Sequence, residues 1–169
     1  QPGQDWHVTG SGGLALVVDV GEGTAADSGH EVGDLVHVYA GQFDALTPEA
    51  GRDPMCANFR IQGYQTPDGS HQQFMVAQGT QLFDPPSNLS LGAAGSYILT
   101  MGTIYRALFT TLDVDPGSNL FVEGASTGTG RDAVQMAESR NMTITGLVSS
   151  DERGERALEN GADAYIDRK

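Results

Sequence analysis

The spacing of hydrophobic and polar positions separates a β-type first half of the chain from an α/β second half. In the second half, the apolar run 120–122 follows Pro116-Gly117, which is typical of a short buried strand. After Gly130, apolar residues recur at helical spacing. They are Ala133, Val134, Met136 and Ala137. The pattern predicts a strand, a glycine-rich turn and a helix in that order.

The turn between this strand and helix contains Gly124, Gly128 and Gly130, with Ser126 and Thr127 among them. Strand, glycine-rich turn and helix is the context in which a backbone approaches a pyrophosphate, whose charge lies at the helix N-terminus. The spacing is not a strict G-x-G-x-x-G, because Thr127 stands where a glycine would be expected. A plain turn without a nucleotide therefore stays open as the alternative.

A second strand is predicted over 143–148, and Ser149, Ser150 and Arg153 follow it. Dinucleotide folds recognise the adenosine ribose after their second strand. Hydroxyls and a guanidinium suit a 2′-phosphate, so we expect NADPH. The carboxylates of 151–152 keep NAD open, and a solvated helix face is the alternative for Arg153 and Arg156.

Four short apolar or alternating runs predict a small β-rich module in the first half: 14–20, 32–39, 73–77 and Leu82-Phe83. Ser90 is the predicted N-cap of a helix that continues to Leu112, with Gly95 and Gly102 as permissive interruptions. Near the C-terminus we expect a helix over 155–160, ended by Gly161, and a third strand over 164–166.

Composition and charge exclude several functions. The net charge of −13, with a single lysine, gives no basic patch for nucleic acid or an anionic membrane. The lone Cys56 allows neither a disulfide framework nor a cysteine-based metal site. No signal peptide or long apolar run is present, so we expect a cytoplasmic protein that does not enter the membrane. Three strands are fewer than a doubly wound sheet needs, and we expect a longer polypeptide.

Three segments resemble the medium-chain dehydrogenase/reductase superfamily. Val32–Val36 is similar to the superfamily's Val-Gly-Asp-x-Val turn. Gly124–Gly130, with Ala133 and Gln135, is similar to its nucleotide loop. Leu158–Asp163 is similar to its Leu-Gly-Ala-Asp helix end. The resemblance implies an α/β fold: a β-rich GroES-like module over 1–89, then a linking helix and the first half of a Rossmann dinucleotide-binding domain over 90–169.

Other segments resemble one branch, the crotonyl-CoA carboxylase/reductases, which includes acrylyl-CoA reductase domains of propionyl-CoA synthases. These segments are His7–Ser11, Arg60–Ser70 with Gln73-Phe74, Thr103–Arg106 and Val148–Ser150. The resemblance implies NADPH-dependent reduction of a short enoyl-CoA by hydride transfer, then protonation of the resulting enolate. Reductive carboxylation of the enoyl-CoA and reduction of a quinone or small ketone are the alternatives. The resemblance to this branch also implies an acyl-CoA thioester as substrate, and we expect a homo-oligomer.

Site residues follow from the same resemblance. The nucleotide would be held by Gly124, Ser126, Thr127, Gly128, Gly130, Ser149, Ser150 and Arg153. Thr100 and Thr103 would face the nicotinamide, with ordinary helix packing as the alternative. Tyr64 and Gln65 stand where carboxylating members have an aromatic-Glu pair in the CO2 pocket. Glutamine carries no carboxylate, so we favour simple reduction.

A metal site is not expected. Gly29-His30-Glu31 is in the wrong register for the zinc alcohol dehydrogenase motif, since a strand turn follows at once. No four-cysteine lobe is present, and Cys56 is expected to be a quiet thiol. The scattered His7, His37 and His71 are expected in loops or on the surface.

Overall fold

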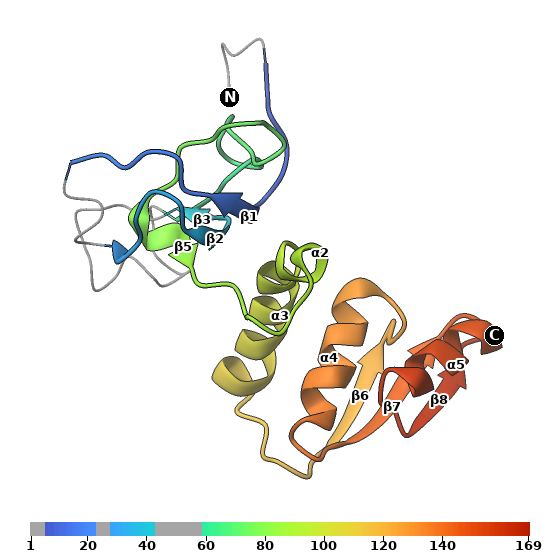
Figure 1. Cartoon of the computed structure of the whole chain (residues 1–169). Helices are drawn as coiled ribbons and strands as arrows, with labels where there is room; N and C mark the ends of the chain where they lie inside the picture. The colour runs from blue at the N-terminus through green and yellow to red at the C-terminus, as the bar shows by residue number, and fades with distance from the viewer. Residues whose placement is uncertain (1–5, 23–27, 43–58) are drawn as a thin grey trace. The chain divides into compact units, whose positions relative to one another are not determined.

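The computed structural model of the chain describes residues 6–22, 28–42 and 59–169. The chain divides into two compact units, residues 1–99 and 100–169, here called the first and second units. Helix α3 (Tyr97–Tyr105) continues across the division (Figure 1). Each unit is described by itself, and the expected domain boundary after residue 89 stays a prediction.

The first unit is built on short antiparallel strands. Strands β1 (Gly13–Leu16), β2 (Leu35–Val38) and β5 (Leu82–Phe83) form one sheet in the order β1-β2-β5. A second pair joins β3 (Gly41–Gln42) to β4 (Arg60–Ile61). A 3₁₀ turn, η1 (Gly79–Gln81), precedes β5. Gly33 has a φ of +101° in the turn before β2, a conformation that favours glycine. The predicted β-rich character of this half is confirmed.

One of the predicted strands is wrong. Residues 73–77 form no strand, and Phe74 and Val76 are 64% and 89% exposed. Their β-forming side chains pair with none of the strands described in this unit, and strand propensity without a partner does not make a strand. The strands predicted over 14–20 and 32–39 exist but are shorter than expected.

Ser90 caps a helix as predicted, and the helix is then interrupted. The Ser90 hydroxyl accepts a hydrogen bond from the Ala93 amide at 3.3 Å, at the start of α2 (Leu91–Ala94). Gly95 ends α2, whereas Gly102 lies within α3 without breaking it. After α3 the backbone continues as a π-helical segment, η2 (Arg106–Thr111). The single helix predicted from 90 to 112 is therefore three segments.

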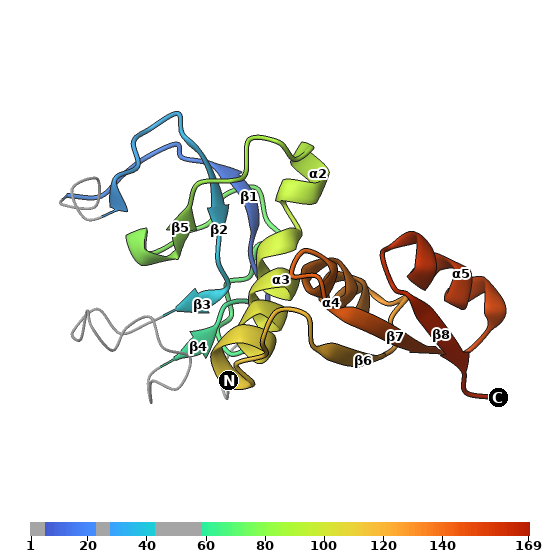
Figure 2. The ribbon, with the colours of Figure 1, turned by 90° about the horizontal axis from the view of Figure 1, so that it is seen from below.

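The second unit is a parallel sheet with helices on one face (Figures 1 and 2). Strands β6 (Asn119–Glu123), β7 (Thr143–Val148) and β8 (Ala164–Asp167) lie in the order β6-β7-β8. Helix α4 (Gly128–Glu138) connects β6 to β7, and α5 (Asp151–Glu159) connects β7 to β8. The side chains that face the helices are buried or half-buried, whereas Phe121 and Ile166 on the other face are exposed. The predicted strands and helices of this unit are confirmed, with α5 beginning four residues earlier than expected.

Small residues let the helices of the second unit approach its sheet. A Cβ built on Gly146 of β7 would lie 2.7 Å from the Cβ of Ala125 and 3.6 Å from that of Ala157. Both alanines are fully buried. On α5, a Cβ at Gly154 would meet the ring of Tyr165 at 2.4 Å. The glycines therefore make room for close packing that larger side chains would prevent.

His37 is buried, and its prediction as a loop or surface residue is wrong. It lies on β2 with 2% of its surface exposed, and its ring meets that of Tyr97 edge to face. Its Nδ1 donates a hydrogen bond to the Ala94 carbonyl at 2.8 Å. Burial lowers the pKa of His37 below its ordinary value, and the hydrogen bond to Ala94 offsets part of this. The first unit therefore favours a neutral imidazole.

Protonation of His37 is expected to weaken the first unit in mildly acidic solution. Because its pKa is lowered in the folded state, the unfolded state binds the proton first, and stability falls as pH decreases below about 6.5. We expect the free energy of unfolding of the first unit to decrease between about pH 6.5 and 5. Hydrogen exchange of the β1 and β2 amides, followed against pH, measures it. His37→Asn, whose amide can still donate to Ala94, should lower stability at every pH but abolish this slope. If the stability of His37→Asn depends on pH as that of the unsubstituted protein does, His37 is not the cause of the pH dependence.

Candidate nucleotide-binding site

The turn between β6 and α4 is closed by Gly124 and Thr127. Gly124 has a φ of +70°, and its amide donates to the Leu147 carbonyl at 2.9 Å. The Gly124 carbonyl accepts hydrogen bonds from the amide and the hydroxyl of Thr127, both at 2.8 Å. The Thr127 hydroxyl in turn accepts from the Gly130 amide at 3.4 Å. Thr127 is thus the N-cap of α4, and a β-branched residue fits there because its φ is −85°.

Gly130 is required by the packing of the turn. A Cβ at this position would lie 2.1 Å from the Gly124 carbonyl oxygen and 3.0 Å from the Cα of Ala125. Gly128 is different, because a Cβ there would meet nothing within 4 Å. One glycine therefore holds helix α4 against the turn, and the other leaves open space at the helix start.

The N-terminus of α4 is suited to an anion. The first amides of a helix have no partner within it, and the helix dipole adds a partial positive charge. The helix has 11 residues, and no acidic side chain lies in its first turn. Ser126 is half-buried immediately before the cap. This arrangement of turn and helix is the one that binds pyrophosphate in dinucleotide folds.

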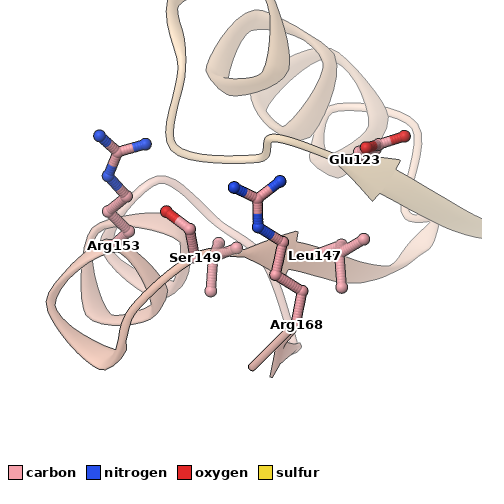
Figure 3. Close-up of a pocket in the computed structure, with 6 residues that line it drawn as sticks. Glu123, Leu147, Ser149, Arg153 and Arg168 are labelled. Atoms are coloured by element: carbon pink, nitrogen blue, oxygen red, sulfur yellow. The ribbon is translucent and has the colours of Figure 1, made fainter.

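A small pocket of about 80 Å³ lies beyond the carboxyl ends of the strands (Figure 3). The residues that line it come from β6, from the end of β7, from α5 and from the segment after β8. They are Glu123, Leu147, Val148, Ser149, Arg153 and Arg168. In open α/β sheets, ligands bind at this edge. The predicted Ser149 and Arg153 are brought together here.

Ser150 lies beside the pocket as the N-cap of α5. Its hydroxyl accepts a hydrogen bond from the Arg153 amide at 3.4 Å. The hydroxyl proton is left to donate to another group, because a hydroxyl can accept and donate at once. Ser150 therefore fixes the start of α5, and with it the base of the Arg153 side chain.

Two guanidinium groups are free to bind an anion at the pocket. Within the described part of the chain, neither Arg153 nor Arg168 forms an ion pair, whereas Arg156 pairs with Glu152 at 2.5 Å. Figure 3 shows the Arg153 and Arg168 guanidiniums extending on either side of Ser149. The Arg168 amide donates to the Val148 carbonyl at 3.0 Å, which anchors its backbone beside the end of β7.

Arg168 and Glu123 were missed by the sequence reasoning. A signal was available, because Glu123 is the last residue of β6 and Arg168 follows β8 directly. The carboxyl ends of neighbouring parallel strands meet at one edge, so charged residues there belong with Ser149.

The residues predicted for catalysis lie outside this pocket. Thr100 is half-buried and Thr103 exposed, one turn apart on α3, and both make interactions within the chain. Tyr64 and Gln65 belong to the first unit. Tyr64 is 79% exposed, and the Gln65 side-chain oxygen accepts a hydrogen bond from the Ile61 amide at 2.9 Å. Gln65 thus caps its own turn.

The described residues contain neither a metal-binding cluster nor a membrane-spanning helix. No group of three or more histidine, cysteine or carboxylate side chains there could hold a metal ion. Cys56 lies outside the described residues. None of the helices in the described ranges is both long and apolar enough to cross a membrane.

The chain is similar to known oxidoreductases. No family model matches it. A crotonyl-CoA carboxylase/reductase of Cereibacter sphaeroides is 36% identical over 170 residues, which cover 98% of this chain and 39% of the relative. A crotonyl-CoA carboxylase/reductase, AntE, solved in complex with NADP, has a TM-score of 0.89 and 32% identity over 98% of this chain and 41% of its own. The solved structure of an NAD-dependent alcohol dehydrogenase has a TM-score of 0.84 and 28% identity. The match covers 96% of this chain and 47% of the dehydrogenase.

These similarities extend over both units. Its sequence and fold are similar to those of the medium-chain dehydrogenase/reductase superfamily. This confirms the α/β fold class, a GroES-like module followed by Rossmann-type strands and helices. The chain spans about two fifths of the length of the carboxylase/reductases that it matches. The glycine-rich turn and the pocket lie within one unit, residues 100–169.

The two glycines of the turn give a direct test of its packing. Gly130→Ala places a Cβ against backbone atoms that cannot move independently, and we expect a loss of about 1–3 kcal/mol in the stability of the second unit. Hydrogen exchange of the β6 and β7 amides measures it. Gly128→Ala is the matched control, because its Cβ meets open space, and it should exchange like the unsubstituted protein. Equal exchange for both variants would show that Gly130 is not needed for packing.

Proposed function

We propose that this chain is part of an NADPH-dependent enoyl-CoA reductase that converts a short enoyl-CoA, of the acrylyl- or crotonyl-CoA type, to the saturated acyl-CoA. The observation that supports this cofactor is the pair of guanidiniums beside Ser149 at the strand ends, neither of which forms an ion pair with any described residue. The similarity to crotonyl-CoA carboxylase/reductases supports the thioester. The residues present fit a dinucleotide, because the Gly128 position is open and α4 begins with unpaired amides.

The cofactor residues form two groups in this proposal. Gly124, Ser126, Thr127, Gly128 and Gly130 form the turn that receives the pyrophosphate. Ser149, Ser150 and Arg153 bind the 2′-phosphate, and Arg168 joins them. A phosphate monoester carries close to two negative charges at neutral pH, and bidentate guanidinium contacts suit it. NADH has a ribose hydroxyl in place of the 2′-phosphate, so it would offer the two arginines no anionic group to bind.

The bound nicotinamide would supply the hydride for reduction of the enoyl thioester. Thr100 and Thr103 would orient it, since their hydroxyls lie one turn apart on α3. Tyr64 and Gln65 would line the substrate side. The Gln65 side-chain oxygen is engaged by the Ile61 amide, and an amide carries no charge to order a water. This favours protonation of the reduced substrate over its capture of CO2.

Two other functions compete with this one. Reductive carboxylation is favoured by the carboxylase/reductase relatives themselves. Reduction of a quinone or small ketone would use the same nucleotide turn without any CoA. Membership of the branch that includes acrylyl-CoA reductase domains of propionyl-CoA synthases is part of the proposal. So are a longer parent polypeptide, a homo-oligomer and a cytoplasmic location.

The deciding experiment follows NADPH absorbance with the parent protein and crotonyl-CoA or acrylyl-CoA, with and without bicarbonate, and separately with a free quinone. We expect oxidation of NADPH with the thioester alone, and a saturated acyl-CoA as the product by mass. A carboxylated product would overturn the interpretation of Gln65. Turnover with the quinone but not with the thioester would show that the substrate is a quinone and not an enoyl-CoA.

Arg153 and Arg168 can be tested one at a time. Arg153→Ala and Arg168→Ala should each raise the KM for NADPH by about ten- to one-hundredfold, the value of a charge-assisted contact, and leave the KM for NADH unchanged. Arg156→Ala, on the same helix but outside the pocket, is the matched control. If all three variants keep the NADPH KM of the unsubstituted protein, the pocket does not bind the 2′-phosphate.

A further inference from the structure

The proposed phosphate pocket contains one carboxylate as well as two guanidiniums. Glu123 is the last residue of β6 and lines the pocket together with Ser149, Arg153 and Arg168. Its pairing with Leu147 of β7 fixes its backbone at the edge of the sheet where the pocket lies. In Figure 3 the Glu123 carboxylate lies on the far side of the Arg168 guanidinium from Arg153. A negative charge is therefore built into a site for a dianion.

Glu123 is not neutralised by the arginines beside it. Within the described ranges, no ion pair or hydrogen bond joins its side chain to Arg153, to Arg168 or to any other residue. The residue is exposed, so its carboxylate faces solvent and whatever occupies the pocket. Its field therefore acts on a bound anion instead of being cancelled by a partner.

We infer that Glu123 is a specificity-determining residue that limits the preference for NADPH over NADH. The inference rests on the proposed function, because it requires the 2′-phosphate to bind at this pocket. The carboxylate repels the 2′-phosphate, which NADH lacks, and so weakens NADPH selectively. A carboxylate oxygen can also accept a hydrogen bond from a ribose 2′-hydroxyl, as acidic residues do in NAD sites. Both effects move the preference toward NADH.

The size of the effect is limited by solvent. Interactions between exposed charges are weakened by water and by salt. Neutralising Glu123 should therefore strengthen NADPH binding by about two- to fivefold, a small change beside the loss expected for either arginine. The effect should decrease as ionic strength rises, because the Debye length falls from about 10 Å at 0.1 M to about 3 Å at 1 M salt.

The test compares Glu123→Gln with the unsubstituted parent protein, using fluorescence titration with NADPH and with NADH at low and high salt. We expect the Kd for NADPH to fall two- to fivefold at low salt, the Kd for NADH to stay level or rise, and the gain for NADPH to shrink at high salt. Glu159→Gln, at the opposite end of α5, removes the same charge outside the pocket and should change neither Kd.

Two results would overturn the inference. An unchanged NADPH-to-NADH ratio in Glu123→Gln would show that the carboxylate does not act on the cofactor. Weaker NADPH binding would show instead that Glu123 supports Arg168. The arginine variants separate this failure from that of the proposed function. If Arg153→Ala and Arg168→Ala leave NADPH binding intact, the pocket is not the cofactor's and both proposals fall. If they weaken it, only the role of Glu123 is lost.

Discussion

The second unit depends on the close approach of helix α4 to the turn that precedes it. With only a hydrogen at the Cα of Gly130, the helix can begin directly over the Gly124 carbonyl, where a Cβ would lie 2.1 Å from the oxygen. The same carbonyl accepts two hydrogen bonds from Thr127, which caps the helix. The start of α4 is therefore held at a set distance from the end of β6, and its free amides face the place where an anion would bind.

The charged pocket depends on a second constraint, the parallel pairing of three strands. Each strand ends at the same edge, and each brings a polar residue to it: Glu123 after β6, Ser149 after β7 and Arg168 after β8. Arg153 is added by α5, whose start is fixed by the Ser150 cap. Small residues at Gly146 and Gly154 keep the helices close enough to the sheet for these ends to converge. The set of charged side chains at this edge is thus a product of backbone register.

Much of the second unit could be predicted from local pattern. The strands β6 and β7 consist mainly of apolar and β-branched residues, and Gly161 ends α5 with a φ of +106°, as its position in the sequence indicates. Prediction failed where a residue's state depends on distant partners. Residues 73–77 have strand-forming side chains but pair with no described strand, and the buried His37 contacts the Ala94 carbonyl and the Tyr97 ring, both distant in the sequence.

The sequence by itself determined the order of elements in the second unit, the glycine turn and the positions of the serines and arginine after β7. These are local properties, since glycine conformations, caps and hydrophobic periodicity depend on neighbours in the chain. The tertiary structure decided which charges share a site. Glu123 and Arg168 are 45 positions apart in the sequence, and only the β6-β7-β8 order brings them to one pocket with Arg153. Convergence of this kind is set by strand pairing, which no single stretch of sequence encodes.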